Sequence, residues 1–307
     1  MFEIIFLGTS ASAPSIQRGL SAQMVLHDEH RFLIDCGEGT QRQLLKSGLG
    51  FKRLERILIT HGHLDHILGL GGLISTFSRW ETAEEMAIYA GPWALERIKD
   101  LLLGVVLRGE KPPLRLDFIP LEPGVLLDER KFRLRTFHVS HRGPDCFGFA
   151  FEEKDHRPFL VEQAEALGVP PGPERRQLVA GQPVTLADGR VITPDQVLGE
   201  TVPGARLVFV GDAGRTDTLV REVHGADLLV IEATYLEEEA EMARQFGHLT
   251  AAQAARLAAE AQVQRLCLTH ISRRHQASAV LAEAQPIFAN VHVASDFDHL
   301  KVTRQRP

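Results

Sequence analysis

Three histidines and one aspartate lie within six positions of the sequence, in the string Thr60-His-Gly-His-Leu-Asp-His66. The apolar segment Arg56–Ile59 before it is expected to be a strand, and a helix is expected to follow. Alternate residues of an extended loop point the same way, so His61 and His63 can bind one cation while Asp65 and His66 turn toward a second. Imidazole and carboxylate ligands suit zinc, and paired metal ions suit phosphodiester cleavage. The string therefore predicts a dinuclear metal site at a strand end.

Such a site needs further ligands from distant loops, and three candidates follow other expected strands. They are His141 after Phe132–Phe137, Asp212 after Leu207–Val210, and His270 after Leu266–Thr269. Each candidate lies shortly after an expected strand, as the string Thr60–His66 does. His138 lies three residues before His141 and competes with it for the same role.

The rest of the chain is typical of an α/β protein. Apolar segments bounded by turns are expected to be strands at Glu3–Leu7, Ala22–Leu26, Arg31–Ile34, Arg206–Val210, Asp227–Ile231, Arg265–Thr269 and Val291–Ala294. Residues 66–79 have near-helical apolar spacing, and Thr250 with Gln253 forms a capping box for a helix to about Gln262. Residues 152–202 are charged and proline-rich, which predicts a projecting insertion.

Composition narrows the class of protein. At 307 residues, with 44% hydrophobic residues, the chain can bury a large core. We expect a cytoplasmic protein with no membrane segment, because no apolar stretch approaches eighteen residues and the N-terminus lacks a secretory pattern. Three widely spaced cysteines indicate buried thiols rather than disulfides. A net charge of −6 argues against nonspecific nucleic-acid binding, so any such binding depends on a local patch.

The H-x-H-x-D-H string resembles the signature of the metallo-β-lactamase superfamily, and nearly the whole chain resembles the short form of ribonuclease Z. The resemblance to that family is carried by six strings and by the Gly-Pro segment Gly168–Pro173. The strings are Phe6-Leu-Gly-Thr-Ser10, Asp35-Cys-Gly-Glu-Gly-Thr-Gln41, Thr60–His66, Ile231-Glu-Ala-Thr234, Gly247-His-Leu-Thr250 and Leu268-Thr-His-Ile-Ser272. The resemblance implies an αββα sandwich over residues 1–307, with 152–202 as an inserted tRNA-binding arm.

The resemblance also implies an activity and a ligand set. The activity is removal of the 3′ trailer from precursor tRNA, in a homodimer where the arm of one subunit serves the active site of the other. Two Zn²⁺ ions per subunit are expected, with Mn²⁺ or Fe²⁺ as possible substitutes. The ligands would be His61, His63 and His141 for one ion, Asp65, His66 and His270 for the other, and Asp212 as the bridge.

The reaction needs a nucleophile and an acid. A water between two zinc ions should lose a proton near neutral pH, and Asp65 could steer it or accept its proton. His248 is the candidate acid for the departing ribose oxygen, and Glu232 the candidate partner that orients it. Asp35 is expected either to orient a metal-bound histidine or to have only a structural role in the turn where it lies.

Several alternatives stay open. Arg175 and Arg176 beside the Gly-Pro turn either meet phosphates or form a solvated cluster. Ile16 and Gly19 stand where the family has lysine and asparagine in a loop associated with the CCA end, so cleavage after the discriminator, cleavage after CCA and exonucleolytic trimming all remain possible. Rival functions are a small-molecule hydrolase of the same superfamily and a noncatalytic RNA-binding subunit.

Overall fold

The structure is a computed structural model that describes residues 1–80, 84–110 and 114–304. The chain divides into two compact units, one formed by Met1–Glu152 with Ala205–Pro307 and the other by Glu153–Gly204. The limits of the smaller unit lie within two residues of the insertion expected at 152–202.

Within the described residues, the larger unit contains two seven-stranded sheets. The first has the order β16-β1-β2-β3-β4-β5-β6, from β1 (Phe2–Gly8), β2 (Ala22–His27), β3 (His30–Ile34), β4 (Arg56–Leu58), β5 (Glu85–Ala90), β6 (Arg115–Pro120) and β16 (His299–Val302). The second has the order β15-β14-β13-β12-β9-β8-β7, from β7 (Gly124–Asp128), β8 (Phe132–Val139), β9 (Cys146–Glu153), β12 (Arg206–Gly211), β13 (Leu228–Glu232), β14 (Leu266–Thr269) and β15 (Val291–Val293).

The central strands are mostly apolar, and both of their faces are buried. In β12, Leu207 and Phe209 lie in the core between the sheets, whereas Val208 and Val210 lie in the core beneath the outer helices. Successive side chains of a strand point to opposite faces, so one strand contributes to both cores. The core between the sheets is rich in phenylalanine, and Phe32 contacts Phe132 edge to face with ring centroids 6.0 Å apart.

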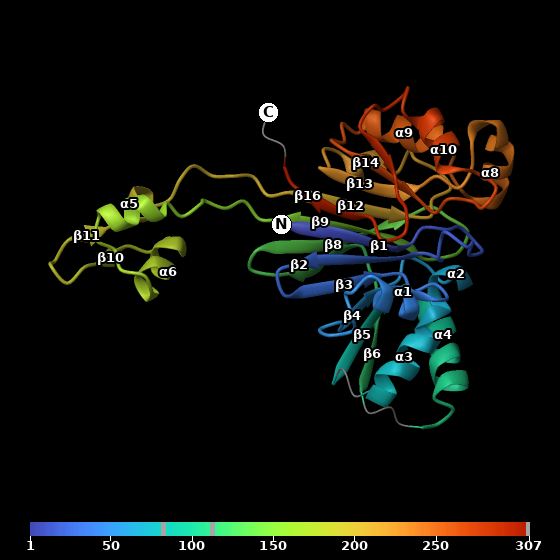
Figure 1. The fold of residues 1–307 in the computed structure, drawn as a ribbon, viewed down its shortest axis with the longest axis horizontal. Helices are drawn as coiled ribbons and strands as arrows, with labels where there is room; N and C mark the ends of the chain where they lie inside the picture. The colour runs from blue at the N-terminus through green and yellow to red at the C-terminus, as the bar shows by residue number, and fades with distance from the viewer. Residues whose placement is uncertain (81–83, 111–113, 305–307) are drawn as a thin grey trace. The chain divides into compact units, whose positions relative to one another are not determined.

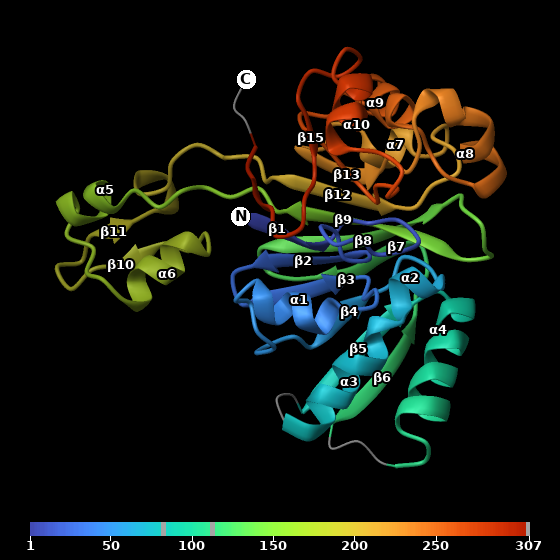
Figure 2. The ribbon, with the colours of Figure 1, turned by 45° about the vertical axis from the view of Figure 1, so that its right-hand side comes forward.

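Helices cover the outer face of each sheet and complete an αββα sandwich (Figures 1 and 2). On the first sheet lie α1 (Thr40–Lys46), α3 (Gly69–Trp80), α4 (Pro92–Lys99) and the π-helical η1 (Asp100–Val106). On the second lie α7 (Val220–Val223), α9 (Ala251–Glu260) and α10 (Ala277–Ala284). The remaining helices of this unit are α2 (Leu64–Ile67), η3 (Glu237–Glu239) and α8 (Ala240–Phe246).

The helix expected over residues 66–79 is confirmed over most of its length as α3, but it begins at Gly69, after the separate short helix α2 ends at Ile67. The N–H of Gly69 donates to the carbonyl of Cys36, 2.9 Å away, instead of continuing the helical ladder. A Cβ at Gly69 would lie 2.0 Å from the Gly37 carbonyl oxygen, so only glycine fits this contact. The close approach ties the ligand-bearing loop to the turn that follows β3. The other expected helix begins at the Thr250 cap as predicted and ends at Glu260.

The smaller unit has a hydrophobic core of its own. It contains α5 (Val161–Ala166), α6 (Pro173–Val179), η2 (Pro194–Gln196) and the hairpin of β10 (Val184–Thr185) and β11 (Val191–Ile192). Ala164, Leu178, Val184 and Ile192 are among its buried residues. Arg175 belongs to this packing, since its guanidinium donates to the carbonyl of Val169 at 3.0 Å, whereas Arg176 is exposed.

The three cysteines are buried, as expected, and no disulfide joins them. Across residues 1–80, 84–110 and 114–304, no helix is both long enough and apolar enough to cross a bilayer.

Candidate metal centre

The site lies where strands of both sheets end. The string from His61 to His66 follows β4, and the other three candidate ligands, His141, Asp212 and His270, follow β8, β12 and β14. The two sheets come close together here, because the N–H of Phe147 in β9 donates to the carbonyl of Thr60, which follows β4, at 2.8 Å. Gly211 permits this approach, since its φ is 73° and a Cβ there would lie 3.0 Å from Thr60. Strand ends from both sheets thus surround one small volume.

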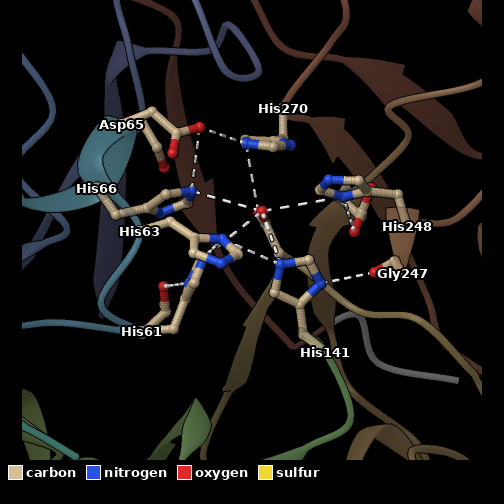
Figure 3. Close-up of polar contacts among 12 residues, drawn as sticks. His61, His63, Asp65, His66, His141, Gly247, His248 and His270 are labelled. Atoms are coloured by element: carbon tan, nitrogen blue, oxygen red, sulfur yellow. Dashed lines mark hydrogen bonds and ion pairs between the residues drawn. The ribbon is translucent and has the colours of Figure 1, made fainter. Parts of the chain in front are cut away.

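Asp212 stands at the centre of the cluster. Its Oδ2 lies 3.7 Å from His61 Nε2, 3.5 Å from His66 Nε2 and 3.8 Å from His141 Nε2. Its Oδ1 lies 3.4 Å from His270 Nε2. Figure 3 shows the labelled imidazoles arranged around one point, with the dashed contacts converging there. One buried carboxylate therefore faces histidines from several separate loops.

The ligand atoms form two groups that meet at Asp212. His61, His63, His141 and Asp212 form the first, and Asp65, His66 and His270 form the second, with atoms in each group within 4.8 Å of one another. These are the two sets that the sequence resemblance implies, so the fold brings all seven predicted residues together. His138 is not among them, because it is exposed and its ring lies 4.9 Å from that of Phe147.

The first group fits a cation because its nitrogens face one another. His63 Nδ1 lies 2.9 Å from His61 Nε2 and 3.3 Å from His141 Nε2. The Nδ1 atoms of the latter two are already used, since His61 donates to Thr60 Oγ1 at 2.9 Å and His141 to the Gly247 carbonyl at 2.6 Å. Their inward nitrogens are therefore lone pairs, which a shared cation would hold at such separations.

The second group, together with Asp212, leaves buried polar atoms without hydrogen-bond partners. His66 Nε2, His270 Nε2 and Asp212 Oδ1 are buried and have no hydrogen bond among the described residues. A buried polar atom without a partner costs about 1–3 kcal/mol. Three such atoms around one point are satisfied together by a metal ion, so the residues present fit a pair of cations.

Two buried carboxylates orient the cluster from behind. Asp35 accepts a 2.7 Å hydrogen bond from His66 Nδ1 and also binds the Thr60 hydroxyl that accepts from His61. Glu232 accepts from His248 Nδ1 at 2.9 Å. It also accepts from the hydroxyl of Thr234, which in turn accepts from His270 Nδ1 at 2.9 Å. Each carboxylate thus orients one histidine directly and a second through a threonine.

The sequence reasoning did not single out Thr60, Thr234 or the Gly247 carbonyl. All three lie inside strings that carry the family resemblance, so the signal was present, but their contacts depend on loops far apart in the chain. Asp35 has a φ of 57°, and His270 one of 56°, in the left-handed region that non-glycine residues seldom occupy. These strained conformations aim both side chains into the site.

In the first group of ligands, burial and charge favour the protonation states that metal binding requires. Burial, with the neighbouring His141 charge, lowers the pKa of His63 to about 4. Burial also lowers the pKa of His61, and that of His141. Burial opposes ionisation of Asp212, but the surrounding histidines outweigh it and hold the pKa of Asp212 well below its usual value. Neutral imidazoles around an ionised carboxylate are the forms that bind metal.

His248 differs from the other histidines. Burial alone would lower the pKa of His248, but the adjacent Glu232 carboxylate outweighs it and raises that pKa to about 9. The ring is therefore protonated near neutral pH, as an acid must be. His248, Glu232, His141 and Asp212 also form a third group that could hold a metal ion, which gives His248 a second possible role.

We expect Asp35→Asn to lower metal affinity about 10–100-fold, because the amide accepts less strongly from His66 and so orients it less well. Chelator competition with the purified protein measures the change. Asp28→Asn is the matched control, since Asp28 is exposed and pairs with Lys131 away from the site. An affinity equal to that of the control would show that Asp35 only stabilises the turn in which it lies and does not orient a ligand.

Comparison with known proteins gives two family models. That of the anti-Pycsar protein Apyc1 matches residues 2–159, and that of the beta-lactamase superfamily domain matches residues 175–271. A curated ribonuclease Z of Bradyrhizobium sp. (strain ORS 278) is 50% identical over 98% of this chain and 100% of its own length. The ribonuclease Z of Archaeoglobus fulgidus is 40% identical over 99% of this chain and 98% of its own.

Solved structures agree with the observed fold. The short form of human tRNase Z superimposes with a TM-score of 0.69 at 26% identity, covering 98% of this chain and 100% of that one. The metallo-beta-lactamase fold protein YhfI from Bacillus subtilis has a TM-score of 0.70 at 18% identity, covering 97% of this chain and 98% of its own, and shows the fold alone.

Proposed function

The chain belongs to the ribonuclease Z family of the metallo-β-lactamase superfamily, and on this premise we propose that it is the endoribonuclease that removes the 3′ trailer from precursor tRNA. Family membership makes it a phosphodiester-hydrolysing enzyme that depends on a divalent metal. A small-molecule hydrolase is not favoured, because curated relatives at 40–50% identity over nearly the full chain are ribonucleases Z.

We further propose two Zn²⁺ ions per subunit, with Mn²⁺ or Fe²⁺ as substitutes. His61, His63 and His141 would hold one ion and Asp65, His66 and His270 the other, and Asp212, which faces histidines of both groups, would serve both. When bound, the two cations supply Lewis acidity that activates water and neutralises charge on the phosphate.

The chain's own residues then handle protons and orientation. Asp65 Oδ2 accepts from the N–H of Ser12 at 2.9 Å and lies 3.5 Å from His270 Nε2, so it is held at the cluster's edge where it orients the attacking water and accepts its proton. His248 gives a proton to the departing 3′ oxygen, with Glu232 fixing its ring. The P–O3′ bond breaks, which leaves a 3′-hydroxyl on the tRNA and a 5′-phosphate on the trailer.

One juxtaposition supports this function most directly. The ring of His248, whose pKa is raised, lies next to the metal-ligating cluster, with its Nδ1 3.9 Å from Asp212 Oδ2. A site that activates water on one side of a phosphate and supplies a proton on the other fits a leaving alkoxide such as ribose O3′.

Mapping product ends tests the proposal. The purified protein should cleave 3′-extended tRNA, with and without an encoded CCA, to a 3′-hydroxyl product, and a chelator should abolish this until Zn²⁺ is restored. The same experiment locates the cut relative to the discriminator and CCA. A protein that hydrolyses bis-p-nitrophenyl phosphate but leaves every extended tRNA intact would instead be a small-molecule phosphodiesterase.

We propose that the unit Glu153–Gly204 is the arm that binds tRNA, that it serves the active site of a partner subunit in a homodimer, and that the enzyme works in the cytoplasm. Arg176 is exposed and available to a phosphate, whereas Arg175 is engaged within the unit. Because the whole protein carries a net charge of −6, such local contacts should make binding steeply salt-dependent.

Deleting residues 155–200 should spare hydrolysis of bis-p-nitrophenyl phosphate while reducing tRNA cleavage at least about 100-fold, the effect of losing roughly 3 kcal/mol of binding. A short linker can replace the unit, since the position of a Cβ on Gly204 falls 2.1 Å from the Glu153 carbonyl oxygen and the two ends are adjacent. Steady-state kinetics measure the change in kcat/KM on each of the two substrates. Equal losses on both would contradict the arm's proposed role.

A further inference from the structure

His63 differs from the other four candidate histidine ligands in what orients its ring. Each of the others, His61, His66, His141 and His270, donates its Nδ1 proton to a protein oxygen. His63 instead turns its Nδ1 toward the cluster, 2.9 Å from His61 Nε2 (Figure 3), and its Nε2 makes no hydrogen bond within the part of the chain that the structure describes. A metal-ligating imidazole is ordinarily oriented by such a bond, so another contact has to hold this ring.

Outside the cluster, the ring of His63 contacts Trp93, which lies in the first turn of α4. The two ring centroids are 6.5 Å apart and the planes meet at 87°, an edge-to-face arrangement that aromatic pairs prefer. The indole also closes on the residue before His63, since a Cβ on Gly62 would lie 2.9 Å from Trp93 Cζ3 and 3.0 Å from Ala94 Cα. Glycine at position 62 is therefore what lets α4 approach the ligand loop.

Arg97, one turn further along α4, holds the same part of the backbone by a hydrogen bond. Its Nη1 donates to the carbonyl of Gly62 at 2.8 Å. Its guanidinium lies over the indole of Trp93, with Cζ 5.1 Å from the ring centroid, and both side chains are half-buried. The Gly62 carbonyl belongs to the peptide bond that joins Gly62 to His63, so fixing its direction fixes the backbone from which the His63 side chain extends.

The start of α4 is in turn tied to the loop that follows His141. The N-cap residue of the helix, Gly91, has no side chain, and Asp145 Oδ2 takes that role by accepting from the N–H of Trp93 at 2.8 Å. A Cβ on Gly91 would lie 2.2 Å from the same oxygen, so glycine is needed here as well. Trp93 therefore contacts both loops, the one that carries His63 and the one that follows His141.

We propose that Trp93 and Arg97 are positioning residues for the metal ligand His63. The indole limits rotation of the imidazole, and the guanidinium fixes the peptide before it, so that Nδ1 stays turned toward the first group of ligands. The inference rests on the proposed function only in taking that group as a cation site. Helix α4, which carries no ligand, would thereby contribute to metal affinity.

A double-mutant cycle with His63 tests the proposal. Each protein is stripped of metal, and its affinity for Zn²⁺ alone is measured by competition with chelators of graded strength, so that neither RNA nor catalysis enters the measurement. We expect Trp93→Ala to raise the Kd of one of the two ions at least about 10-fold and to leave the Kd of the other unchanged. In a His63→Ala background the same substitution should change the Kd less than about 2-fold, because the ligand through which Trp93 acts is already gone.

Two further variants on α4 control for general damage to the helix. Arg97→Met should raise the same Kd as Trp93→Ala, because it removes the hydrogen bond to Gly62. Lys99→Met is the matched control and should change neither Kd, since Lys99 is an exposed cation of the same helix that lies over the ring of Phe118, 5.5 Å from its centroid. Circular dichroism checks folding, and Arg97→Met in both backgrounds carries the test if Trp93→Ala does not fold.

Three results would overturn the positioning role while leaving the proposed function intact. They are wild-type Kd values in folded Trp93→Ala, an equal rise in both Kd values, and the same loss of affinity with and without His63. Wild-type protein that binds no Zn²⁺ would overturn the proposed function together with this inference.

Discussion

Replacing Asp212 by alanine should lower kcat/KM for precursor tRNA by about 10³-fold or more. Asp212 faces both groups of candidate ligands, with Oδ2 3.5 Å from His66 Nε2 and 3.7 Å from His61 Nε2. Its loss removes the shared carboxylate, and with it several kilocalories per mole of charge stabilisation, each ~1.4 kcal/mol being tenfold in rate. Bound zinc, measured by elemental analysis, should fall below two ions per chain.

Asp117→Ala is the matched control for this variant, because Asp117 lies on β6, its side chain is 40% exposed, and it pairs with Arg115. Circular dichroism should show that both variants fold. An Asp212→Ala protein that keeps two zinc ions and more than a tenth of the wild-type kcat/KM would exclude Asp212 as the shared ligand.

The second large effect is expected from His248→Ala. Loss of a general acid typically costs about 10²–10⁴-fold in rate, and we expect a fall of that size in kcat on tRNA. Hydrolysis of bis-p-nitrophenyl phosphate should fall much less, because p-nitrophenolate leaves without needing a proton. His138→Ala is the control, since that histidine is exposed and outside the cluster.

The pH profile and the metal content separate the two possible roles of His248. Since Glu232 raises the pKa of His248 to about 9, its acid form predominates below that pH, and wild-type kcat should fall above it. This alkaline limb should be absent in His248→Ala, with zinc content unchanged. Loss of a zinc ion in the variant, with equal loss on both substrates, would make His248 a ligand instead.

The sequence predicted that the H-x-H-x-D-H string and the candidate ligands His141, Asp212 and His270 each follow a strand, and the structure agrees. It could do so because strand and turn signals are local, and because apolar runs such as that of β12 imply strands buried on both faces. It did not predict the break between α2 and α3, which depends on the contact of Gly69 with Gly37. The resemblance implied His141 rather than His138, and the fold brings His141 into the cluster while His138 stays exposed.

The sequence by itself determined which side chains are available: a string of candidate ligands after β4, and further histidines and carboxylates after later strands. It also indicated an insertion that is charged and proline-rich. Tertiary structure decided which of these side chains meet, and that Asp35 and Glu232 orient the cluster through Thr60 and Thr234. The physical reason is that residue type and periodicity act over a few positions. Convergence on one point depends on the packing of two sheets whose strands are far apart in the chain.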